Sequence, residues 1–320
     1  MQIILVTGIH GFIGSYLARR LVKDGFRVVG IDVQPDTDGP WSDYASMVLP
    51  CSFLDEQIRK WQPSYCVHCA GPSSVGNSML DPAADFSGSV TATQGLLDSI
   101  RREAPSCRLV YLSSAAVYGN PVSLPIHEDA PIQPVSPYGF HKRMCEWICL
   151  EFHTIYGIGT AGVRIFSAYG PGLRRQVIAD ICTKLEVNGN RTLELHGTGE
   201  ETRDFIHVDD IVSGIRTVID RAPFQGEFYN LASGTSIRIA YLAEMLRERV
   251  DRGGLIHFSG DRRSGDPLCW SADITKLGAL GFRPAIPIET GLSEYVSWHR
   301  SLLTNLLAEA VDKSGLKGPL

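Results

Sequence analysis

Apolar runs alternate with segments of helical periodicity through the first half of the chain. Strands are expected at residues 2–7, 27–32, 65–69, 108–113 and 161–166, and helices between them near residues 12–24, 83–103 and 137–156. Alternation of this kind predicts a parallel sheet with helices on both faces. We therefore expect an α/β fold built on a doubly wound parallel sheet.

The second half of the chain is less regular and predicts a smaller lobe. Helices are expected at residues 176–187, 239–250 and 289–307, and short strands near 193–195, 205–207 and 228–231. Asp209 is expected to cap a helix that runs to about residue 221. Residues 253–254 and 262–267 carry loop signals. We expect a first domain at residues 1–166, rejoined by about 208–235, and a discontinuous α/β lobe at 167–207 and 236–320.

Length and charge narrow the class of protein. The 320 residues suit one large α/β unit with a second lobe. The formal net charge of −5 argues against broad binding to nucleic acid. No stretch is long and apolar enough to span a membrane, and the amino-terminal residues lack the basic region of a signal peptide. The expected location is the cytoplasm, with neither nucleic acid nor membrane as a partner.

The eight cysteines are spaced irregularly, which favours reduced thiols. Cys66-x-x-Cys69 could form a redox site or half of a zinc site, but no second such motif completes it. The pair lies in a predicted strand, where alternation points the two thiols to opposite faces. Cys145 and Cys149 share one helical face and are expected to be buried. No metal site is predicted.

A glycine motif joins the first strand to the first helix. Gly8 permits a tight turn, Gly11 allows the backbone to approach a pyrophosphate, and Gly14 allows close packing of helix on strand. The helix then begins at Phe12 and Ile13, and its free N–H groups favour phosphate binding. This pattern predicts a dinucleotide site of the Rossmann type.

An acidic residue, Asp32, ends the second predicted strand. A carboxylate at this position accepts hydrogen bonds from ribose hydroxyls and repels a 2′-phosphate, so it favours NAD over NADP. The alternative is a solvated residue at a strand end.

A candidate catalytic set follows. Tyr138 and Lys142 form a Tyr-x-x-x-Lys pair, which lies on one face of a helix that Pro137 is expected to begin. An ammonium favours a phenolate, and lowering a tyrosine pKa from about 10 to about 7 requires roughly 4 kcal/mol. Ser114 follows an apolar strand, at the sheet edge where ligands bind, and could orient the reacting oxygen. The alternatives are an exposed helix face and ordinary turn chemistry.

Together these motifs resemble the extended short-chain dehydrogenases of the NAD-dependent epimerase/dehydratase type, in particular the UDP-glucose 4-epimerases and related nucleotide-sugar epimerases. The resemblance covers nearly the whole chain. It is carried by Thr7–Gly14, Asp32, His68–Gly71, Ser113–Gly119, Tyr138–Lys142, Ala168–Gly172, Arg203–Asp210 and Arg263–Asp266.

The resemblance implies roles for individual residues. It implies that Ser114, Tyr138 and Lys142 act as a catalytic triad, that Lys142 also binds the nicotinamide ribose, and that Ala70 and Gly71 contact NAD. The first domain then binds NAD and the second lobe binds the nucleotide sugar. The implied substrate-binding residues are Ser114, Ser167, Gln176, Arg203, Arg263, Asp266 and Trp270. Among them, Arg203 and Arg263 would hold the diphosphate, since arginine gives forked donors suited to phosphate, and Asp266 a ribose hydroxyl. The alternative for either arginine is a surface ion pair.

The sequence departs from the family pattern at three places. Ser89 and Ser167 stand where the family often has asparagine, which affects a proton relay and a phosphate contact. No acid follows the third strand, which is expected to end in the run 48–52. The basic segment Gly172–Gln176 could replace the missing phosphate contact.

Four functions compete. In 4-epimerisation Tyr138 removes the O4 proton and the C4 hydride passes to NAD. The 4-keto sugar then rotates, and the hydride returns to its other face. A 4,6-dehydration needs an acid after the catalytic serine, but Ala115 and Ala116 stand there. Reduction of a 4-keto sugar normally uses NADPH, which Asp32 disfavours; it is the second choice. A non-catalytic NAD-sensing protein would not need the intact triad. We expect a 4-epimerase acting on a nucleotide sugar, with a UDP-hexose favoured.

Two further expectations rest on the resemblance. The helices near 83–103 and 137–156 would pair with a second copy, so a homodimer is expected. In the resembling 4-epimerases, a second aspartate stands seven positions after the aspartate of the ribose-binding motif. The residue three positions before that second aspartate faces the C2 substituent of the sugar. Here the acids are Asp266 and Asp273, so Trp270 would close that space against N-acetylhexosamines. The alternative is that Trp270 only packs in the core.

Overall fold

The computed structural model describes residues 2–33, 45–46, 51–188, 192–250, 254–261 and 268–314. The chain forms two compact units. Unit 1 comprises Met1–Ala168, Thr202–Ser236 and Arg263–Ala285, and unit 2 comprises Tyr169–Glu201, Ile237–Arg262 and Ile286–Leu320.

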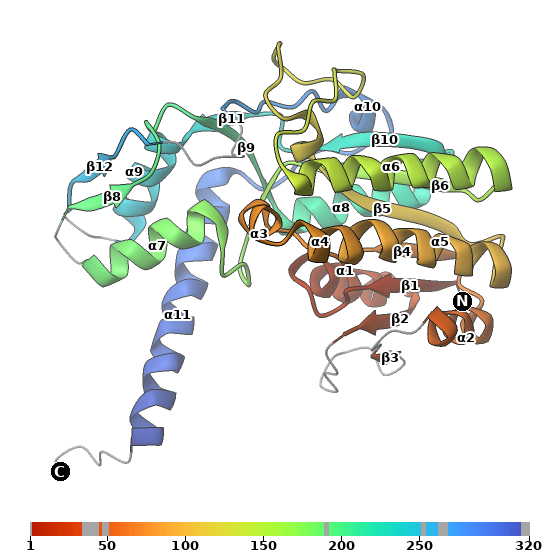
Figure 1. Ribbon diagram of the computed structural model, residues 1–320. Coiled ribbons are helices and arrows are strands. Elements are labelled where there is room, and N and C mark those ends of the chain that lie inside the picture. Colours follow the sequence, from red (N-terminus) through yellow and green to blue (C-terminus); the bar gives the residue numbers. More distant parts are fainter. Residues whose placement is uncertain are drawn as a thin grey trace. The chain divides into compact units, whose positions relative to one another are not determined.

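Unit 1 is built on a seven-stranded sheet with the order β10-β6-β5-β4-β1-β2-β3 (Figure 1). All neighbouring strands are parallel. The strands are β1 (Ile3–Thr7), β2 (Arg27–Asp32), β3 (Ala45–Ser46), β4 (Tyr65–His68), β5 (Arg108–Ser114), β6 (Thr160–Ile165) and β10 (Gln225–Leu231). The direction of winding reverses between β1 and β4, and in such sheets ligands bind beyond the carboxyl ends of the strands at this point.

Helices cover both faces of the sheet, each through its own apolar core. On one face α1 (Phe12–Lys23) and α8 (Val208–Arg221) bury residues such as Leu17 and Ile215. On the other face lie α2 (Cys51–Trp61), α5 (Ala92–Glu103) and α6 (Pro137–Tyr156), with Leu97 and Cys149 in the core. This arrangement confirms the predicted doubly wound α/β fold.

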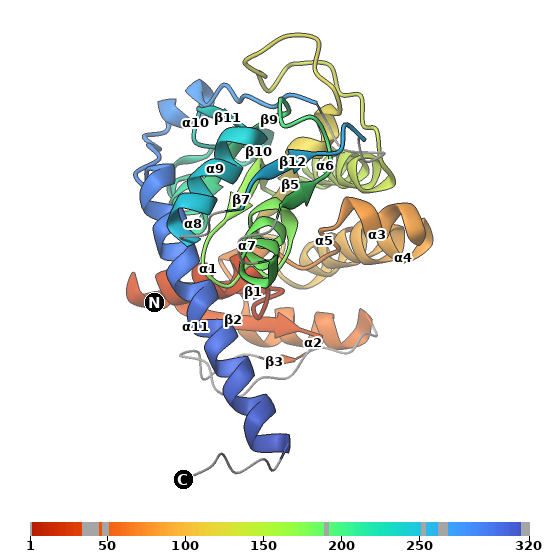
Figure 2. The ribbon, with the colours of Figure 1, turned by 90° about the vertical axis from the view of Figure 1, so that its left-hand side faces the viewer.

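The remaining elements are short or belong to unit 2. Unit 1 also holds α3 (Val75–Leu80), α4 (Pro82–Phe86), the π-helical turn η1 (Ser87–Thr91), the 3₁₀ turn η2 (Ala115–Tyr118) and α10 (Thr275–Ala279). A three-stranded sheet has the order β11 (Ser236–Arg238), β9 (Thr202–His207), β7 (Ser167–Tyr169). In unit 2, β8 (Leu193–Leu195) pairs in parallel with β12 (Ile256–Phe258), and α9 (Ile239–Val250) packs with α7 (Gln176–Asn188) and α11 (Ile288–Ser314) (Figure 2).

Several elements differ from the sequence prediction. The helix expected near 83–103 is α4, a π-helical turn and α5 in succession. Asp209 is not the cap of α8, because His207 occupies that position and its Nδ1 accepts the Asp209 N–H at 3.3 Å. Residues 48–50 lie outside the described residues, while the third strand of the sheet lies at Ala45–Ser46 and α2 begins at Cys51. The loop predicted at 262–267 lies outside the described residues, as does residue 253 of the loop predicted at 253–254.

Part of the region expected in the second lobe belongs to unit 1. The segment 263–285 and strand β9 group with the large sheet. The reason is packing, because Trp270 and Ala272 lie in one apolar cluster with Tyr118 and Phe166, and Ala272 forms a bridge with Ile126. In the part of the chain that the structure describes, no helix has the length and apolar character needed to cross a membrane.

Candidate active site

The glycine loop between β1 and α1 is packed so closely that side chains would not fit. Gly8 has a φ of +66°, donates its N–H to Ile31 O at 2.7 Å, and a Cβ there would lie 2.7 Å from Ala70 N. A Cβ on Gly14 would lie 2.1 Å from Gly8 O. Within the described residues no side chain caps the amino end of α1, whose cap position is Gly11. The first N–H groups of α1, including those of Phe12 and Ile13, therefore suit a phosphate.

Asp32 lies at the end of β2, beside this loop. One carboxylate oxygen accepts the His10 N–H at 2.9 Å and the other accepts the Val33 N–H at 2.7 Å. A carboxylate has further lone pairs, so Asp32 retains the capacity to accept hydroxyl protons. Ala70 and Gly71 follow β4, and Ala70 donates its N–H to Thr7 Oγ1 at 3.2 Å, which places them against the same loop.

The three residues expected to act in catalysis come from two neighbouring elements of unit 1. Ser114 ends β5 and caps η2, its Oγ accepting the Ala116 N–H at 3.1 Å. Lys142 on α6 is buried, donates from Nζ to Leu112 O at 2.9 Å, and its Nζ lies 5.8 Å from the centre of the Tyr138 ring. Tyr138 is half-buried and packs against the apolar cluster formed around η2. The structure therefore brings the three residues to one end of β5.

The local sequence explains how α6 presents these side chains. Ser136 caps the helix by accepting the Gly139 N–H at 3.2 Å, and Gly157, with a φ of +69°, ends it. Gly139 lies between the tyrosine and the lysine, and a Cβ there would lie 2.5 Å from Ala116 O. The helix can therefore approach η2 only because residue 139 is glycine. The Tyr138 N–H is held by Ser78 Oγ at 3.1 Å.

A neutral histidine, His68, lies close to Lys142. Burial, and then the charge of Lys142, lower the pKa of His68 to about 3, so this ring is neutral. His68 Nδ1 lies 2.6 Å from Thr7 Oγ1. Thr7 Oγ1 also accepts the Ala70 N–H, so this hydroxyl links the end of β4 to the His68 ring. This Thr7–His68 pair was not predictable from the sequence, because its partners are 61 residues apart.

The expected substrate-binding residues lie in different parts of the chain. Arg203 on β9 donates from Nη1 to Leu268 O at 3.1 Å, and its guanidinium lies 5.6 Å from the centre of the Trp270 ring. Trp270 is 9% exposed and donates from Nε1 to Gly119 O at 3.0 Å, so it is packed beneath the loop that follows η2. Ser167 is half-buried on β7, and Gln176 begins α7 in unit 2. Arg263 and Asp266 lie outside the described residues.

The cysteines behave as expected for buried thiols. Cys66 is buried and Cys69 half-buried, neither forms a disulfide, and burial raises the pKa of Cys69 to about 12. Cys145 and Cys149 lie on the buried face of α6, in the apolar core. Within the described ranges, no group of three or more histidine, cysteine or acidic side chains is arranged to hold a metal ion.

Comparisons with known proteins agree with this geometry. A family model described as the NAD dependent epimerase/dehydratase family matches residues 4–232. A putative UDP-glucose 4-epimerase of Methanocaldococcus jannaschii is 29% identical over 308 residues, covering 93% of this chain and 98% of that protein. A dTDP-glucose 4,6-dehydratase of Streptomyces griseus is 30% identical, with 93% and 95% covered.

A solved structure gives the same result for the fold. The UDP-glucuronic acid 4-epimerase of Bacillus cereus, in complex with UDP-glucuronic acid and NAD, superposes with a TM-score of 0.85 at 25% identity, covering 94% of this chain and 100% of that one. With a family match over most of its length and a glycine loop of the required form, the chain belongs to the NAD-dependent epimerase/dehydratase family.

Proposed function

We propose that the chain is an NAD-dependent nucleotide-sugar 4-epimerase that acts on a UDP-hexose through a 4-keto intermediate. The observation that carries the proposal is the neighbourhood of Ser114. Lys142 is bonded to Leu112 O, two residues before Ser114, and Tyr138 packs against the apolar cluster around η2, whereas the next two residues after Ser114 are the buried Ala115 and Ala116. A dehydratase needs an acid at this place to protonate its leaving hydroxyl, and an epimerase does not.

The residues at the glycine loop fit NAD. The spaces above Gly8 and Gly14 are too small for any side chain, and the uncapped end of α1 faces the loop. Asp32 lies where a carboxylate binds ribose hydroxyls and repels a 2′-phosphate, which favours NAD over NADP. When bound, NAD supplies the acceptance and return of hydride at the sugar C4.

Side chains of this protein remove and return the proton of the sugar O4 hydroxyl. The Tyr138 hydroxyl, in its deprotonated form, takes the proton from the sugar O4 and later returns it. The Lys142 ammonium, fixed by its bond to Leu112 O, stabilises the phenolate by its charge. Ser114 Oγ accepts the Ala116 N–H, so its own proton is available to donate to O4 and orient it.

The substrate contacts are part of the same proposal. Arg203, with Arg263, would bind the diphosphate, Asp266 a ribose hydroxyl, and Ser167 and Gln176 the remainder of the nucleotide sugar. Trp270 would limit the size of the C2 substituent. These assignments stay predictions from the family pattern, and so does the cytoplasmic location.

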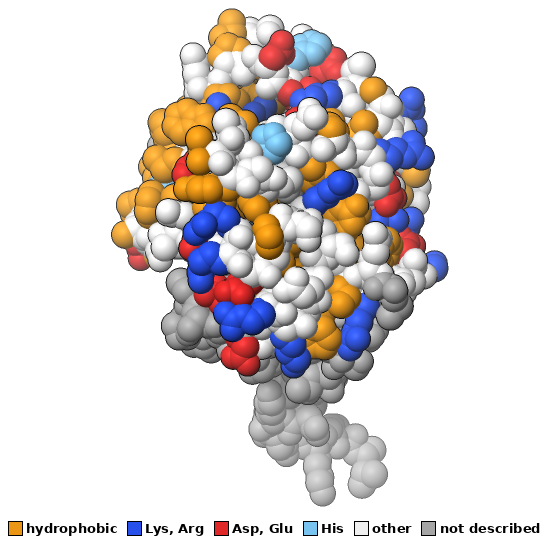
Figure 3. Space-filling model, turned by 90° about the vertical axis from the view of Figure 1, so that its right-hand side faces the viewer, with side chains coloured by type: hydrophobic (Ala, Val, Ile, Leu, Met, Phe, Trp, Pro, Cys, Tyr) orange, Lys and Arg blue, Asp and Glu red, His pale blue; other side chains and the backbone are white. Residues whose placement is uncertain are grey.

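A second copy of the chain is the proposed partner. Large apolar side chains are exposed on α6 and on the neighbouring α3 and α4, and apolar side chains gather along one margin of the molecular face in Figure 3. On α6 these are Phe140, Trp147, Leu150, Ile155 and Tyr156, of which Trp147 is 57% exposed. Exposed apolar groups concentrated on adjacent helices favour burial against an identical surface, as in a symmetric dimer.

The proposal is tested by incubating the purified protein with UDP-, dTDP-, GDP- and CDP-hexoses, without added reductant, and separating the products by chromatography. We expect a UDP-hexose to be converted to its C4 epimer, and Tyr138→Phe to lose at least about 10²-fold in turnover while NAD stays bound. Turnover only of a 4-keto sugar with consumption of NAD(P)H would instead identify a reductase.

A further inference from the structure

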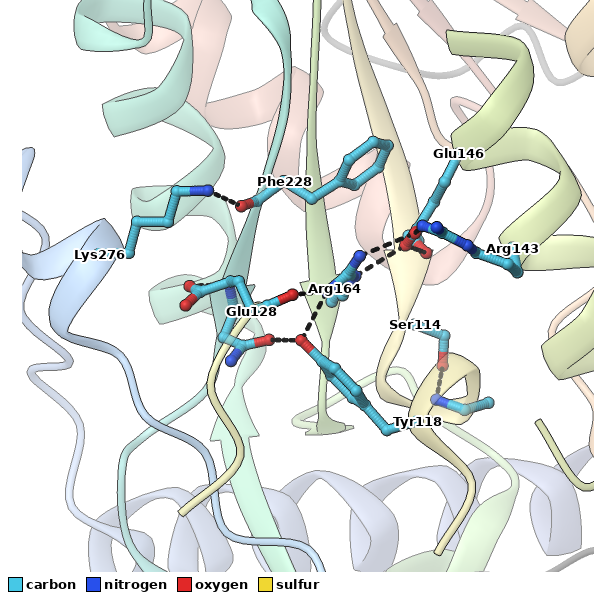
Figure 4. Close-up of polar contacts among 11 residues, drawn as sticks. Ser114, Tyr118, Glu128, Arg143, Glu146, Arg164, Phe228 and Lys276 are labelled. Atoms are coloured by element: carbon cyan, nitrogen blue, oxygen red, sulfur yellow. Dashed lines mark hydrogen bonds and ion pairs between the residues drawn. The ribbon is translucent and has the colours of Figure 1, made fainter. Parts of the chain in front are cut away.

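A buried ion pair lies directly behind the proposed catalytic face of α6. Glu146 follows Lys142 by one helical turn, and its side chain is only 1% exposed. One carboxylate oxygen accepts Ser113 Oγ at 2.7 Å and Arg164 Nε at 2.9 Å. The other oxygen accepts Arg164 Nη2 at 2.9 Å and Arg143 Nη1 at 2.8 Å (Figure 4). Four donors saturate this carboxylate, so it cannot serve as a proton acceptor in the reaction.

Arg164 extends the network to the turn that follows Ser114. It lies on β6, paired with Ser113 in the register of the sheet, and its side chain is 5% exposed. Its Nη1 donates to Tyr118 OH at 2.8 Å and to Glu128 O at 2.8 Å. Tyr118 is the last residue of η2, and burial raises its pKa to about 12, so its neutral hydroxyl donates onward to Asn230 Oδ1 at 2.7 Å (Figure 4).

The network and the catalytic residues share the same two elements. Lys142 is bonded to the carbonyl of Leu112, and Glu146 to the hydroxyl of Ser113. These are the two residues that precede Ser114 on β5. Successive turns of α6 are therefore fixed to successive residues of β5, while Arg164 holds the far end of η2 through Tyr118.

An ion pair of this kind is unnecessary for stability alone. Replacing a buried pair by apolar side chains of similar volume is often neutral or stabilising, because two charges no longer have to be desolvated. Apolar contacts, however, do not fix the orientation of the two side chains. A guanidinium that donates two parallel hydrogen bonds fixes the position of its carboxylate. The pair is therefore suited to holding α6 in one register against β5 and η2.

We propose that Glu146 and Arg164 are positioning residues, which set the location of Tyr138 and Lys142 relative to Ser114. The inference rests on the proposed catalytic role of those three residues. It places Glu146 and Arg164 outside any contact with substrate or NAD, so their loss should lower kcat without a comparable change in KM or in NAD affinity.

The central test is the double variant Glu146→Met/Arg164→Met, which removes both buried charges of the pair; Arg143, which also loses its contact with Glu146, has a side chain that is 27% exposed and reaches solvent. We expect it to melt within a few degrees of the wild type, while kcat falls at least tenfold, KM and NAD affinity stay within twofold, and the pH profile of kcat is displaced. Amide hydrogen exchange in residues 114–118 and 138–142 should also become faster, a readout that needs no substrate. A folded double variant with wild-type kcat, pH profile and exchange overturns the inference.

Two single variants decide the matter if the double variant does not fold. Ser113→Ala removes one hydrogen bond and no charge. Glu146→Gln keeps the shape of the side chain but leaves the buried Arg164 guanidinium without a carboxylate, so its melting temperature is measured beside its kcat. Both should lower kcat several-fold at unchanged KM, and wild-type kcat in both overturns the inference. The matched control is Glu244→Gln, which makes the same change in an exposed pair with Arg247, 2.6 Å apart, and should leave every readout unchanged.

Wild type and Tyr138→Phe are measured in the same assay, so that the two claims can fail separately. If the wild type is active and Tyr138→Phe is not, the network variants test the positioning role alone. If Tyr138→Phe retains full turnover, the proposed function fails. Amide hydrogen exchange in the double variant then still decides whether the ion pair holds η2 and α6 in place. Exchange rates equal to those of the wild type would overturn the positioning role as well.

Discussion

Replacing Gly139 by alanine should slow the reaction in a protein that still folds. The new Cβ would lie 2.5 Å from Ala116 O, whereas ordinary contacts begin at 3.4 Å, so α6 and η2 must separate by about 0.9 Å at this point. Both contacting atoms are tied to secondary structure, so no flexible side chain can absorb the shift. Because Ala116 is two residues from Ser114 and Gly139 is next to Tyr138, the separation acts directly on the proposed catalytic geometry.

The expected loss of stability is similar to or smaller than the expected rise in the activation free energy. Overpacking costs about 1–3 kcal/mol, and alanine recovers about 1 kcal/mol of helix propensity relative to glycine, so the net loss of stability is at most about 2 kcal/mol. A displacement near 1 Å at reacting groups can lower the rate by about 10²-fold, equivalent to about 2.7 kcal/mol in the activation free energy. We therefore expect kcat to fall by one to two orders of magnitude in a protein that still folds.

The assay is the measurement of kcat, KM and melting temperature on the preferred nucleotide sugar. The matched control is Gly76→Ala in α3, whose Cβ would find only Ser74 Oγ at 3.9 Å and should leave kcat unchanged. A Gly139→Ala protein with kcat within twofold of the wild type would show that the spacing of α6 and η2 does not limit the reaction.

Four other predictions concern the cofactor, the sugar, the assembly and pH. Asp32→Ala should narrow the preference for NAD over NADP in a binding titration, and isolation of the native protein with NADP would contradict this. The native enzyme should use a hexose in preference to its N-acetyl counterpart, and Trp270→Ala should reduce that preference; equal use of both by the native enzyme would exclude Trp270 as the gate. Light scattering at micromolar concentration should give about twice the chain mass of 35.1 kDa, and Trp147→Lys should shift the protein towards the monomer; a native monomer would contradict the proposed dimer. Burial raises the pKa of Asp204 to about 6, so the stability gained by protonating it is present at low pH and lost as pH rises through 6. The unfolding free energy of the wild type relative to Asp204→Asn should therefore rise by about 2 kcal/mol between pH 7 and pH 4.5, and a flat difference would refute the assignment.

The parts of the fold that the sequence predicted well are those governed by local rules. The helix expected at 137–156 has these bounds in the structure, because Ser136 and Pro137 specify its start and Gly157 its end. The strands β1, β2 and β5 follow their apolar runs to within one residue at each end. The glycine loop and its acid were predictable because motif, strand and helix follow one another within thirty residues.

The parts that the sequence did not predict leave no distinctive mark in the pattern of residue types. His207 rather than Asp209 caps α8, although both are followed by the same helical pattern. The π-helical turn at Ser87–Thr91 leaves no mark in the hydrophobic pattern. The partners of Glu146 lie up to 33 residues away along the chain, and nothing in the spacing of Arg164 or Ser113 distinguishes a buried ion pair from exposed charges.

The central claim is that hydride leaves and returns to the same sugar carbon while Tyr138 carries the proton. It is tested by following UDP-glucose labelled with deuterium at C4 by nuclear magnetic resonance in ordinary water, without added reductant. The account predicts a mixture of the two C4 epimers, with the label retained at C4 in both. The interconversion of the epimers should be at least about 10²-fold slower in Tyr138→Phe. Loss of the label to solvent during epimerisation, or full activity in Tyr138→Phe, would contradict it.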